Sequence, residues 1–313
     1  MSKLQEALRR ISQSKSAEKG QQGGSRQGAR RRVSSERSKS SFVEVRDGNT
    51  LEEEGALEHH VSLSDEVLSS SGLKPLKGYE DQLARQFGRI KRPIMVNAFD
   101  LARMTTENSN VVMIASALPS TGKSFCALNL ARSIAQERDF GALLVDADVL
   151  KPRVSLALKL EDRLGLIDYL LDDQLTLDDV LVQTDYEGVI VLPAGSQHRD
   201  ATELLASRRM RDLVKRLSER FQSRAVVFDT PPLLLTNEAV VLSKYMGQIA
   251  LVIEAGQTAT EAVNAAVNLL DRDKPINCIL NKVREFAGDI YGSYGYGYNY
   301  GPPLSGEEEV SEQ

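Results

Sequence analysis

The sequence predicts an α/β domain built on a doubly wound, mostly parallel sheet with helices on both faces. Two observations carry this prediction. Short β-rich runs alternate with helical patterns along residues 79–285, an order typical of strand–helix repeats around a parallel sheet. Several of these runs are continuously apolar, as in Val226–Phe228, which is expected of strands that helices cover on both faces.

The expected elements follow in chain order. A helix is predicted over Glu80–Arg92, where Leu83, Phe87 and Ile90 have helical spacing and Pro93 ends the pattern. The predicted strands are Val111–Ala115, Ala142–Val145, Gly188–Leu192, Ala225–Phe228, Ile249–Ile253 and Ile276–Leu280. The main helices between them are predicted over Lys123–Gln136, Thr202–Arg220 and Thr260–Asp271.

Both ends of the chain differ in composition from this domain. Residues 1–50 carry twelve Lys and Arg against five Asp and Glu, whereas the whole chain has a net charge of −5. We therefore expect residues 1–78 to form a basic, then acidic, largely disordered arm. Met1–Lys15 has the spacing of a short amphipathic helix, which suits either a membrane or partner anchor or a helix that forms only part of the time. Residues 286–313 are expected to be a flexible, Tyr-rich tail.

The bulk composition excludes several classes of protein. No apolar run approaches the roughly 20 residues that span a bilayer, and the N-terminus lacks the features of a secretory signal. The two cysteines, Cys126 and Cys278, fall in different expected elements, and no Cys/His cluster has zinc spacing. The sequence thus indicates a cytoplasmic protein that uses no metal except an ion arriving with a nucleotide.

A phosphate-binding loop is predicted between the first strand and the next helix. Val111–Ala115 runs into Ser116-Ala-Leu-Pro-Ser-Thr-Gly-Lys-Ser124, the strand–loop–helix context of a P-loop NTPase. Backbone amides of the loop and first helical turn would face the phosphates, Lys123 would contact the β- and γ-phosphates, and Ser124 would bind Mg²⁺. Ala117 replaces the first glycine of the strict motif, which a turn position with negative φ tolerates. The nucleotide-binding residues expected are Ser120, Thr121, Gly122, Lys123, Ser124 and Phe125.

Two further strands end in carboxylates. Asp146 and Asp148 follow the apolar run Leu143–Val145, one residue apart, and therefore share a face of the extended chain. Asp229 ends Val226–Phe228 in the same way. Ligands bind at this carboxyl edge of parallel strands, and a hydrated Mg²⁺ is a natural partner for such acidic groups. A carboxylate that only caps the next turn is the alternative for each strand taken alone.

Five of the nine tyrosines lie within ten residues of the tail. They are Tyr291, Tyr294, Tyr296, Tyr298 and Tyr300. Gly, Ser and Asn between the rings leave no periodic apolar face, which argues against a core strand or helix. Two interpretations stand, an adhesive low-complexity segment or a set of phosphate acceptors.

Taken together, these motifs resemble the bacterial tyrosine autokinases of exopolysaccharide and capsule export. The similarity is greatest to the stand-alone kinases of exosortase-associated loci. Ser116–Ser124 resembles the family's Walker A motif, Leu144–Pro152 its second Walker A-type motif, and Phe228–Leu233 its Walker B motif, and the tyrosine cluster lies where the family has its own.

The resemblance implies an ATP- and Mg²⁺-dependent kinase that phosphorylates its own tail at Tyr291–Tyr300. Lys123 would hold phosphates, and Asp146 would orient or deprotonate the phenol. Ser124, Asp148 and Asp229 would organise the metal ion, partly through water. The resemblance also implies a homo-oligomer on the cytoplasmic side of the membrane, activated by a separate membrane-embedded chain-length regulator.

Two other functions remain open from the sequence, a regulatory ATPase of the partition and septum-positioning type and a scaffold that binds ATP without turnover. The regulatory ATPases carry a lysine where this chain has Leu118, which argues against them. The glutamates of the family's ring-assembly helix are also missing from the segment Arg85–Arg92, which leaves ring assembly through that helix open.

Overall fold

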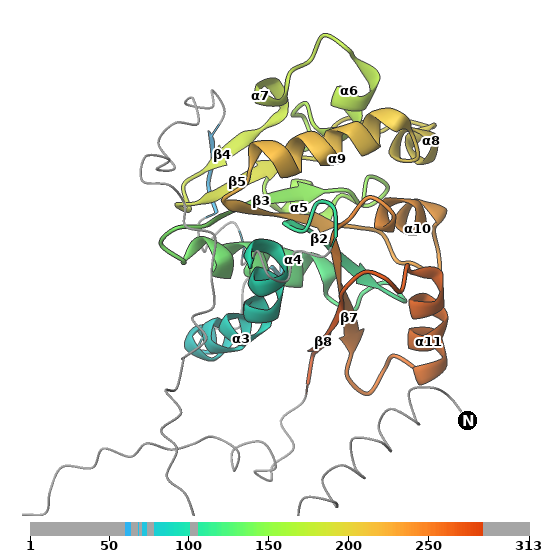
Figure 1. Cartoon of the computed structure of the whole chain (residues 1–313). Helices are drawn as coiled ribbons and strands as arrows, with labels where there is room; N and C mark the ends of the chain where they lie inside the picture. Colours follow the sequence, from blue (N-terminus) through green and yellow to red (C-terminus); the bar gives the residue numbers. More distant parts are fainter. Residues whose placement is uncertain (1–59, 64–67, 69–70, 74–77, 101–105, 284–313) are drawn as a thin grey trace, which may run out of the picture. The chain divides into compact units, whose positions relative to one another are not determined.

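An eight-stranded sheet forms the centre of the computed structural model (Figure 1). The structure describes residues 60–63, 68, 71–73, 78–100 and 106–283. The strands lie in the order β1-β4-β5-β3-β6-β2-β7-β8. Their bounds are β1 His60–Val61, β2 Val111–Ser116, β3 Gly141–Asp146, β4 Val182–Thr184, β5 Val189–Leu192, β6 Arg224–Asp229, β7 Gln248–Glu254 and β8 Ile276–Asn281.

The pairing of the strands confirms the mostly parallel sheet. Strands β5, β3, β6, β2, β7 and β8 pair with their neighbours in parallel. Strand β4 pairs antiparallel with β5, and β1 pairs in parallel with β4. All six predicted strands are present. Strands β1 and β4 were not predicted from the sequence, because they are only two and three residues long.

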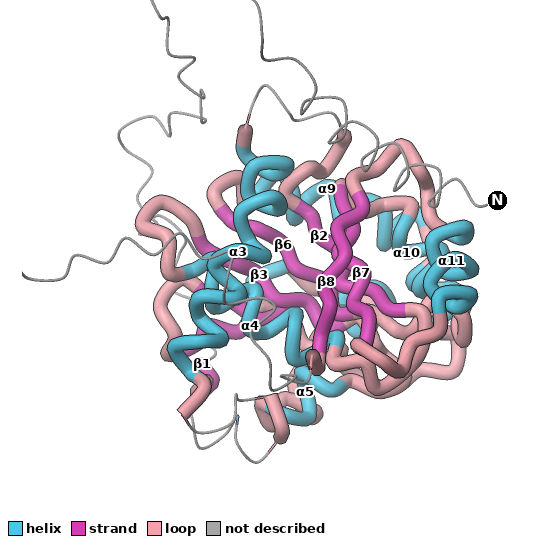
Figure 2. Tube along the Cα trace, turned by 90° about the horizontal axis from the view of Figure 1, so that it is seen from below, coloured by secondary structure: helices cyan, strands magenta, loops and turns pink. Residues whose placement is uncertain are grey.

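Helices cover both faces, as predicted. Their bounds are α3 Glu80–Phe99, α4 Lys123–Ala135, α5 Arg153–Ala157, α6 Leu166–Leu171, α7 Leu177–Val180, α8 Ala201–Leu205, α9 Arg208–Arg220, α10 Asn237–Ser243 and α11 Thr260–Leu269. Helices α3 and α4 lie on one side of the sheet, and α6 to α9 lie on the other (Figure 1). Figure 2 shows the sheet from the side of α3 and α4, with α11 beside the end of the sheet that β7 and β8 form.

Side chains of β2 pack into the hydrophobic cores on both faces of the sheet. Val111, Met113 and Ala115 belong to the core that packs under α6 and α8 to α11, whereas Val112 and Ile114 belong to the core under α3, α4 and α5. All six residues of the strand are buried. The continuous apolar pattern therefore reflects burial on both faces, because successive side chains point to opposite sides.

The predicted end of the first helix at Pro93 was wrong. Helix α3 continues through Pro93 to Phe99. The ring of a proline costs about 3 kcal/mol inside a helix because it removes one hydrogen bond and clashes with the preceding turn. Pro93 itself is exposed, while Ile94, Ala98 and Phe99 beyond it are buried against the sheet. Packing of this last part therefore outweighs the local cost.

The predicted helix over Thr202–Arg220 is divided into α8 and α9. Ser207 lies at the break with extended backbone angles, and its hydroxyl accepts a hydrogen bond from the amide of Met210 at 3.1 Å. A serine in this position satisfies one of the free amides at a helix start. The start of α9 was not predicted because apolar residues keep helical spacing on both sides of the break.

Part of the chain upstream of residue 79 also belongs to this core. Leu63, Leu68 and Leu73 are buried in the layer under α3 and α4. The domain boundary at residue 79 stays a prediction, as does the division at residue 286. The expected helix at Met1–Lys15 and the tyrosines of residues 291–300 lie outside the described residues. Within the described ranges, no helix is both long and apolar enough to span a membrane.

Candidate active site

The predicted phosphate loop connects β2 to α4. Strand β2 ends at Ser116, and Lys123 is the first residue of α4. The Ser116 hydroxyl donates to the carbonyl of Leu118 at 2.6 Å. On the β6 side, the amide of Leu233 donates to the Ser116 carbonyl at 2.9 Å. These bonds hold the entry of the loop against the segment that follows β6.

Two residues at the exit of the loop have left-handed backbone angles. Ser120 and Gly122 have φ values of 62° and 93°, respectively. Ala117 is not among the residues with positive φ, so the absent first glycine requires no strained backbone. A Cβ atom at Gly122 would lie 2.2 Å from Nδ2 of Asn281. The backbone angle therefore favours glycine at residue 122, and a Cβ atom there would also displace the amide of Asn281.

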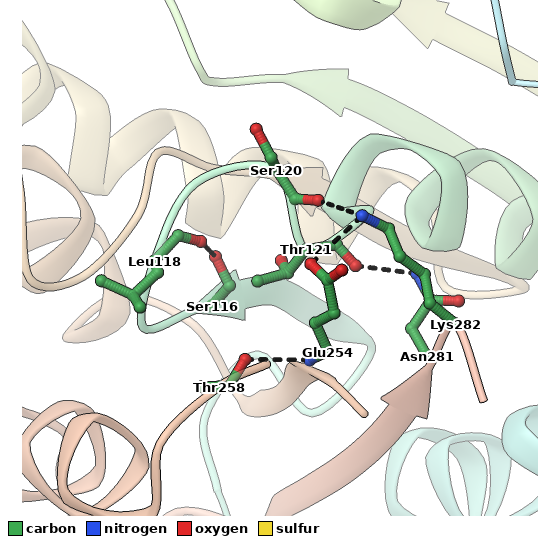
Figure 3. A network of polar contacts seen from close by, with 8 residues as sticks. All are labelled: Ser116, Leu118, Ser120, Thr121, Glu254, Thr258, Asn281 and Lys282. Carbon is green, nitrogen blue, oxygen red and sulfur yellow. Dashed lines mark hydrogen bonds and ion pairs between the residues drawn. The ribbon is translucent and has the colours of Figure 1, made fainter. Parts of the chain in front are cut away.

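The end of β8 contacts the other side of the loop (Figure 3). Asn281 Nδ2 donates to the carbonyl of Thr121 at 2.8 Å, and Lys282 Nζ donates to the carbonyl of Ser120 at 2.6 Å. Lys282 also forms an ion pair with Glu254 at the end of β7, with Nζ 3.1 Å from Oε2. None of these three residues was predicted from the sequence to belong to the site.

Lys123 is buried at the start of α4. Its side chain is almost enclosed, and burial lowers its pKa from the usual value of 10.5. The carboxylates of Asp229 and Asp148 act in the opposite direction and favour the charged form of the lysine. A cation in this position is available to phosphate oxygens that approach the loop.

Asp146 and Asp229 lie side by side at the carboxyl ends of β3 and β6. The two residues are directly opposite each other in the parallel pairing, and both are fully buried. Burial, followed by repulsion from Asp229, raises the pKa of Asp146 to about 8. Burial also raises the pKa of Asp229, to about 7. The hydroxyl of Ser124 and the positive charge of Lys123 oppose this rise, because both favour the charged carboxylate. Neither carboxylate is matched by enough positive charge or hydrogen bonding within the described chain.

The two carboxylates differ in how they are held. Oδ2 of Asp146 accepts hydrogen bonds from the amide of Ser155 at 2.7 Å and from its hydroxyl at 2.8 Å. Oδ1 of Asp146 and both oxygens of Asp229 are buried without a well-formed hydrogen bond to any described residue. The hydroxyl of Ser124 still lies close enough to favour the charged form of Asp229. Buried oxygens without partners are costly, so these atoms are suited to a ligand.

Asp148 lies two residues beyond the end of β3 and is also buried. Burial raises the pKa of its carboxyl group, while Lys123, Lys151 and Arg153 oppose that rise. The electrostatic effects among these side chains show that four residues lie in one cluster. They are the four that were predicted to be catalytic, namely Lys123, Asp146, Asp148 and Asp229. Nothing in the sequence indicated that β3 and β6 are neighbours, which is the pairing that places Asp146 beside Asp229.

A pocket adjoins this cluster at the segment that follows Asp148. Its volume is about 460 Å³. The lining residues are Leu150, Lys151, Pro152, Arg153, Ser155, Leu156, Glu161, Gly195 and Gln197. Ser155 lines the pocket and bonds to Asp146, so the pocket lies next to the buried carboxylates. Sequence reasoning missed Ser155 and Arg153, although both follow the Asp146–Pro152 motif within a few residues.

A metal ion at this site would need ligands from a bound molecule. Among the described residues, no group of three or more His, Cys, Asp or Glu is arranged to hold a metal ion. The oxygens present, from Ser124, Asp148 and Asp229, are of the hard type that Mg²⁺ prefers. The donor set therefore suits Mg²⁺ that shares phosphate oxygens and waters.

Comparison with known proteins identifies the family. No family model matches the chain. The tyrosine-protein kinase YwqD of Bacillus subtilis is 34% identical over 191 residues, which are 60% of this chain and 79% of that protein. The chain belongs to the bacterial tyrosine-protein kinases. Within this family, the match to the tyrosine-protein kinase Ptk of Acinetobacter johnsonii is 31% identical over 169 residues, 54% of this chain but only 22% of the length of Ptk.

A solved structure of a bacterial tyrosine kinase agrees with this assignment. The kinase domain of the Escherichia coli tyrosine kinase ETK superposes with a TM-score of 0.58 at 26% sequence identity. The superposition covers 77% of this chain and 94% of the ETK domain. The P-loop fold predicted from the motifs is thereby confirmed. The closer resemblance to exosortase-associated kinases stays a prediction.

Proposed function

We propose that this chain is an ATP-dependent protein-tyrosine autokinase that phosphorylates its own C-terminal tyrosines. The observation that carries the proposal is the pair of buried carboxylates, Asp146 and Asp229, beside Lys123 at the end of the phosphate loop. Phosphoryl transfer depends mainly on positioning and charge neutralisation. This site offers a cation, an anion-binding loop and a buried base within one cluster.

ATP would bind with its phosphates in the loop. The backbone amides of Thr121, Gly122 and Lys123 lie at the start of α4, where the helix dipole favours negative charge. Lys123 would contact the β- and γ-phosphates. Ser120, Ser124 and Phe125 complete the nucleotide-binding set that we propose.

Mg²⁺ fits the oxygens that the chain leaves without partners. Both oxygens of Asp229 are buried with no well-formed hydrogen bond in the described chain, and the hydroxyl of Ser124 is beside them. We propose that Ser124 and Asp229 hold the ion, with Asp148 taking part through water. When bound, the ion neutralises charge on the β- and γ-phosphates.

Asp146 is proposed to orient the acceptor phenol and take its proton. Ser155 holds Oδ2 of Asp146 and leaves Oδ1 free to accept. In the transfer, the phenolic oxygen forms a bond to the γ-phosphorus of ATP, and the bond from that phosphorus to the β,γ-bridging oxygen breaks. ADP leaves with that electron pair, and the phenolic proton passes to Asp146. The transfer requires the charged form of Asp146, whereas burial raises its pKa and favours the protonated form. Mg²⁺ bound beside the carboxylates would favour the charged form.

The pocket beside Ser155 is a suitable entrance for a tyrosine. Leu150, Pro152 and Leu156 provide apolar contacts for a ring, and Lys151 and Arg153 provide positive charge. Both cations act electrostatically on Asp148, so they would also act on a phosphoryl group bound beside that residue. We propose that Tyr291, Tyr294, Tyr296, Tyr298 and Tyr300 enter here, from the same subunit or from a neighbouring one.

The wider role follows from the family resemblance. We propose that the kinase regulates exopolysaccharide biosynthesis or export, together with a separate chain-length regulator in the membrane. The kinase would then act as a homo-oligomer on the cytoplasmic side. Each phosphotyrosine adds about −1.5 to −2 charges to a tail that already carries Glu307, Glu308 and Glu309. We propose that accumulating phosphate weakens docking of the tail into a neighbouring subunit through repulsion and altered fit.

The central experiment is incubation of the full chain with ATP and Mg²⁺, followed by phosphate mapping with mass spectrometry. The reaction is run with and without the cytoplasmic segment of the membrane regulator. Phosphate is expected on tyrosines 291–300 in the wild type and is expected to be absent in Lys123→Met. Lys215→Met is the matched control, because it removes a lysine from the exposed surface of α9.

Other results would replace the proposal. ATP hydrolysis without phosphotyrosine in both conditions would indicate a regulatory ATPase, and ATP binding without turnover would indicate a scaffold. A mixture of Lys123→Met chains and tail-deleted chains tests the direction of transfer. If the Lys123→Met chains remain unmodified in this mixture, transfer does not occur between subunits.

A further inference from the structure

The carboxyl end of β8 holds two consecutive carbonyl groups of the phosphate loop. Lys282 Nζ donates to the carbonyl of Ser120 at 2.6 Å, and Asn281 Nδ2 donates to that of Thr121 at 2.8 Å (Figure 3). The two donors follow the loop by about 160 residues in sequence. Neither donor is required by the pairing of β8 with β7, which uses backbone groups.

The direction of these carbonyls determines the direction of the adjacent amides. A trans peptide unit is planar, so its N–H points opposite to its C=O. The carbonyl of Ser120 shares a peptide unit with the amide of Thr121, and the carbonyl of Thr121 shares one with the amide of Gly122. Because both carbonyls are directed toward β8, both amides are directed away from β8.

The backbone conformation in this region requires such support. Ser120 has a φ of 62° and Lys282 has a φ of 55°, a region that residues other than glycine adopt only at an energetic cost. Strained residues of this kind persist where surrounding contacts hold them, commonly at functional sites. Here the two strained residues are joined to each other by the Lys282–Ser120 hydrogen bond.

Glu254 orients the lysine. Its Oε2 lies 3.1 Å from Nζ of Lys282, and its amide donates to the hydroxyl of Thr258 at 3.1 Å. The side chain of Lys282 is 46% exposed, whereas that of Glu254 is 21% exposed. Glu254 is thus the more fixed partner. It directs the ammonium group toward the loop and offsets part of its charge.

We propose that Asn281 and Lys282, with Glu254 behind Lys282, are positioning residues that set the amides of Thr121 and Gly122 for phosphate binding. In this arrangement the three side chains act through the loop backbone. Their proposed ligand class is the pyrophosphate group of a nucleoside diphosphate or triphosphate. The inference rests on the proposed nucleotide site, but it is independent of which group accepts the phosphate.

The test compares ADP with inorganic pyrophosphate, which has no base or ribose, by calorimetric titration of the full chain. Lys282→Met is expected to weaken both ligands by the same factor, roughly tenfold, which corresponds to about 1.4 kcal/mol. Lys282→Arg is expected to restore most of the affinity, since it retains a donor and a charge. Asn281→Asp places a carboxylate against the carbonyl of Thr121, so it is expected to cause a loss at least as large.

The controls separate positioning from general damage. Lys215→Met makes the same change on α9 and is expected to leave both affinities unchanged. Glu254→Gln is expected to weaken both ligands about threefold, and its effect is expected to disappear in the Lys282→Met background. Thermal unfolding of each variant without ligand checks that the fold is retained.

Two results would overturn the inference. Unchanged pyrophosphate affinity with weakened ADP affinity would assign Lys282 to the base or ribose instead of the loop. Unchanged affinity for both ligands in folded Lys282→Met and Asn281→Asp would remove any role in nucleotide binding. A chain that binds ADP normally but forms no phosphotyrosine would contradict the proposed function alone, because these titrations do not depend on phosphate transfer.

Discussion

Aspartates at two places in the same sheet show opposite behaviour. At the centre, Asp146 and Asp229 are fully buried, and three of their four oxygens have no well-formed hydrogen bond within the described chain. Both groups have raised pKa values. At the edge, Asp185 follows β4 and accepts hydrogen bonds from the hydroxyl of Ser62 and the amide of Leu63, each at 2.6 Å. The bond from Ser62 is the main cause of its lowered pKa.

The difference separates a carboxylate that the chain itself supplies with donors from two carboxylates that are suited to a ligand. The chain supplies donors for Asp185, and the resulting contacts hold the segment after β1 against the end of β4. The chain supplies too few donors for Asp146 and Asp229, although burial makes their charge expensive. Such a cost is retained where a ligand provides the missing partners, here the proposed metal ion, nucleotide and phenol.

The largest expected effect on tyrosine phosphorylation comes from replacing the carboxylate of Asp146 at the centre of the sheet. Asp146→Asn is expected to reduce tyrosine phosphorylation by at least about 100-fold, because it removes the proposed base. The same variant should leave the melting temperature of the nucleotide-free protein unchanged or higher, since a buried carboxylate is lost. Quantitative mass spectrometry of the tail and thermal unfolding measure the two effects.

A companion variant tests how Asp146 is held. Ser155→Ala removes one of two hydrogen bonds to Oδ2 of Asp146 and leaves the amide of Ala194 without its partner. A loss of roughly tenfold in phosphorylation is expected, because misplacement of the base costs less than its removal. Normal activity in both variants would show that Asp146 has no part in the transfer.

The contributions of the central and the edge aspartates to the stability of the fold should also depend on pH in opposite directions. The folded-state pKa values of Asp146 and Asp229 are raised, so their stabilising contribution is complete below the unfolded value near 3.8 and is lost as the pH rises through about 7 to 8. The pKa of Asp185 is lowered, so its contribution is present above that unfolded value and is lost as the pH falls through the folded value.

In chelator without nucleotide, we therefore expect the melting temperature to fall between pH 5 and pH 8 by at least about 2–4 °C, because a loss of only about 1 kcal/mol lowers it by that much in a domain of this size. Asp229→Asn should flatten this decline, and ADP with Mg²⁺ should reduce it. Differential scanning calorimetry across this range measures the slope. An equal decline in the wild type and in Asp229→Asn would mean that these carboxylates do not cause it.

The smallest expected effect is on the free energy of unfolding, when Asp185 near the edge of the sheet is replaced. Asp185→Asn should lower the free energy of unfolding by no more than about 1 kcal/mol, because the group is exposed and its hydrogen bonds compete with water. Phosphorylation of the tail should be unchanged. Hydrogen exchange at Leu63 should increase, since its amide donates to Asp185. A change in activity would connect the β1 segment to the active site.

The sequence by itself determined the alternating strands, the helices on both faces and the loop before Lys123. These features depend on local patterns, because burial on two faces requires continuous apolar runs and a phosphate loop requires glycine and lysine at fixed spacing. Local patterns failed at Pro93 and at Ser207. At Pro93, packing of Ile94 and Phe99 outweighed the local cost, and at Ser207 a cap began a new helix within an unbroken apolar spacing.

Only the tertiary structure decided which strand ends meet. The order β3-β6-β2-β7-β8 places Asp146 beside Asp229 and brings Asn281 and Lys282 to the loop. Strand order depends on how distant segments bury each other's apolar faces, and no spacing along the chain encodes it. The sequence thus specified the chemical groups of the site, while long-range packing selected the carboxylates that lie together and the side chains that hold the loop.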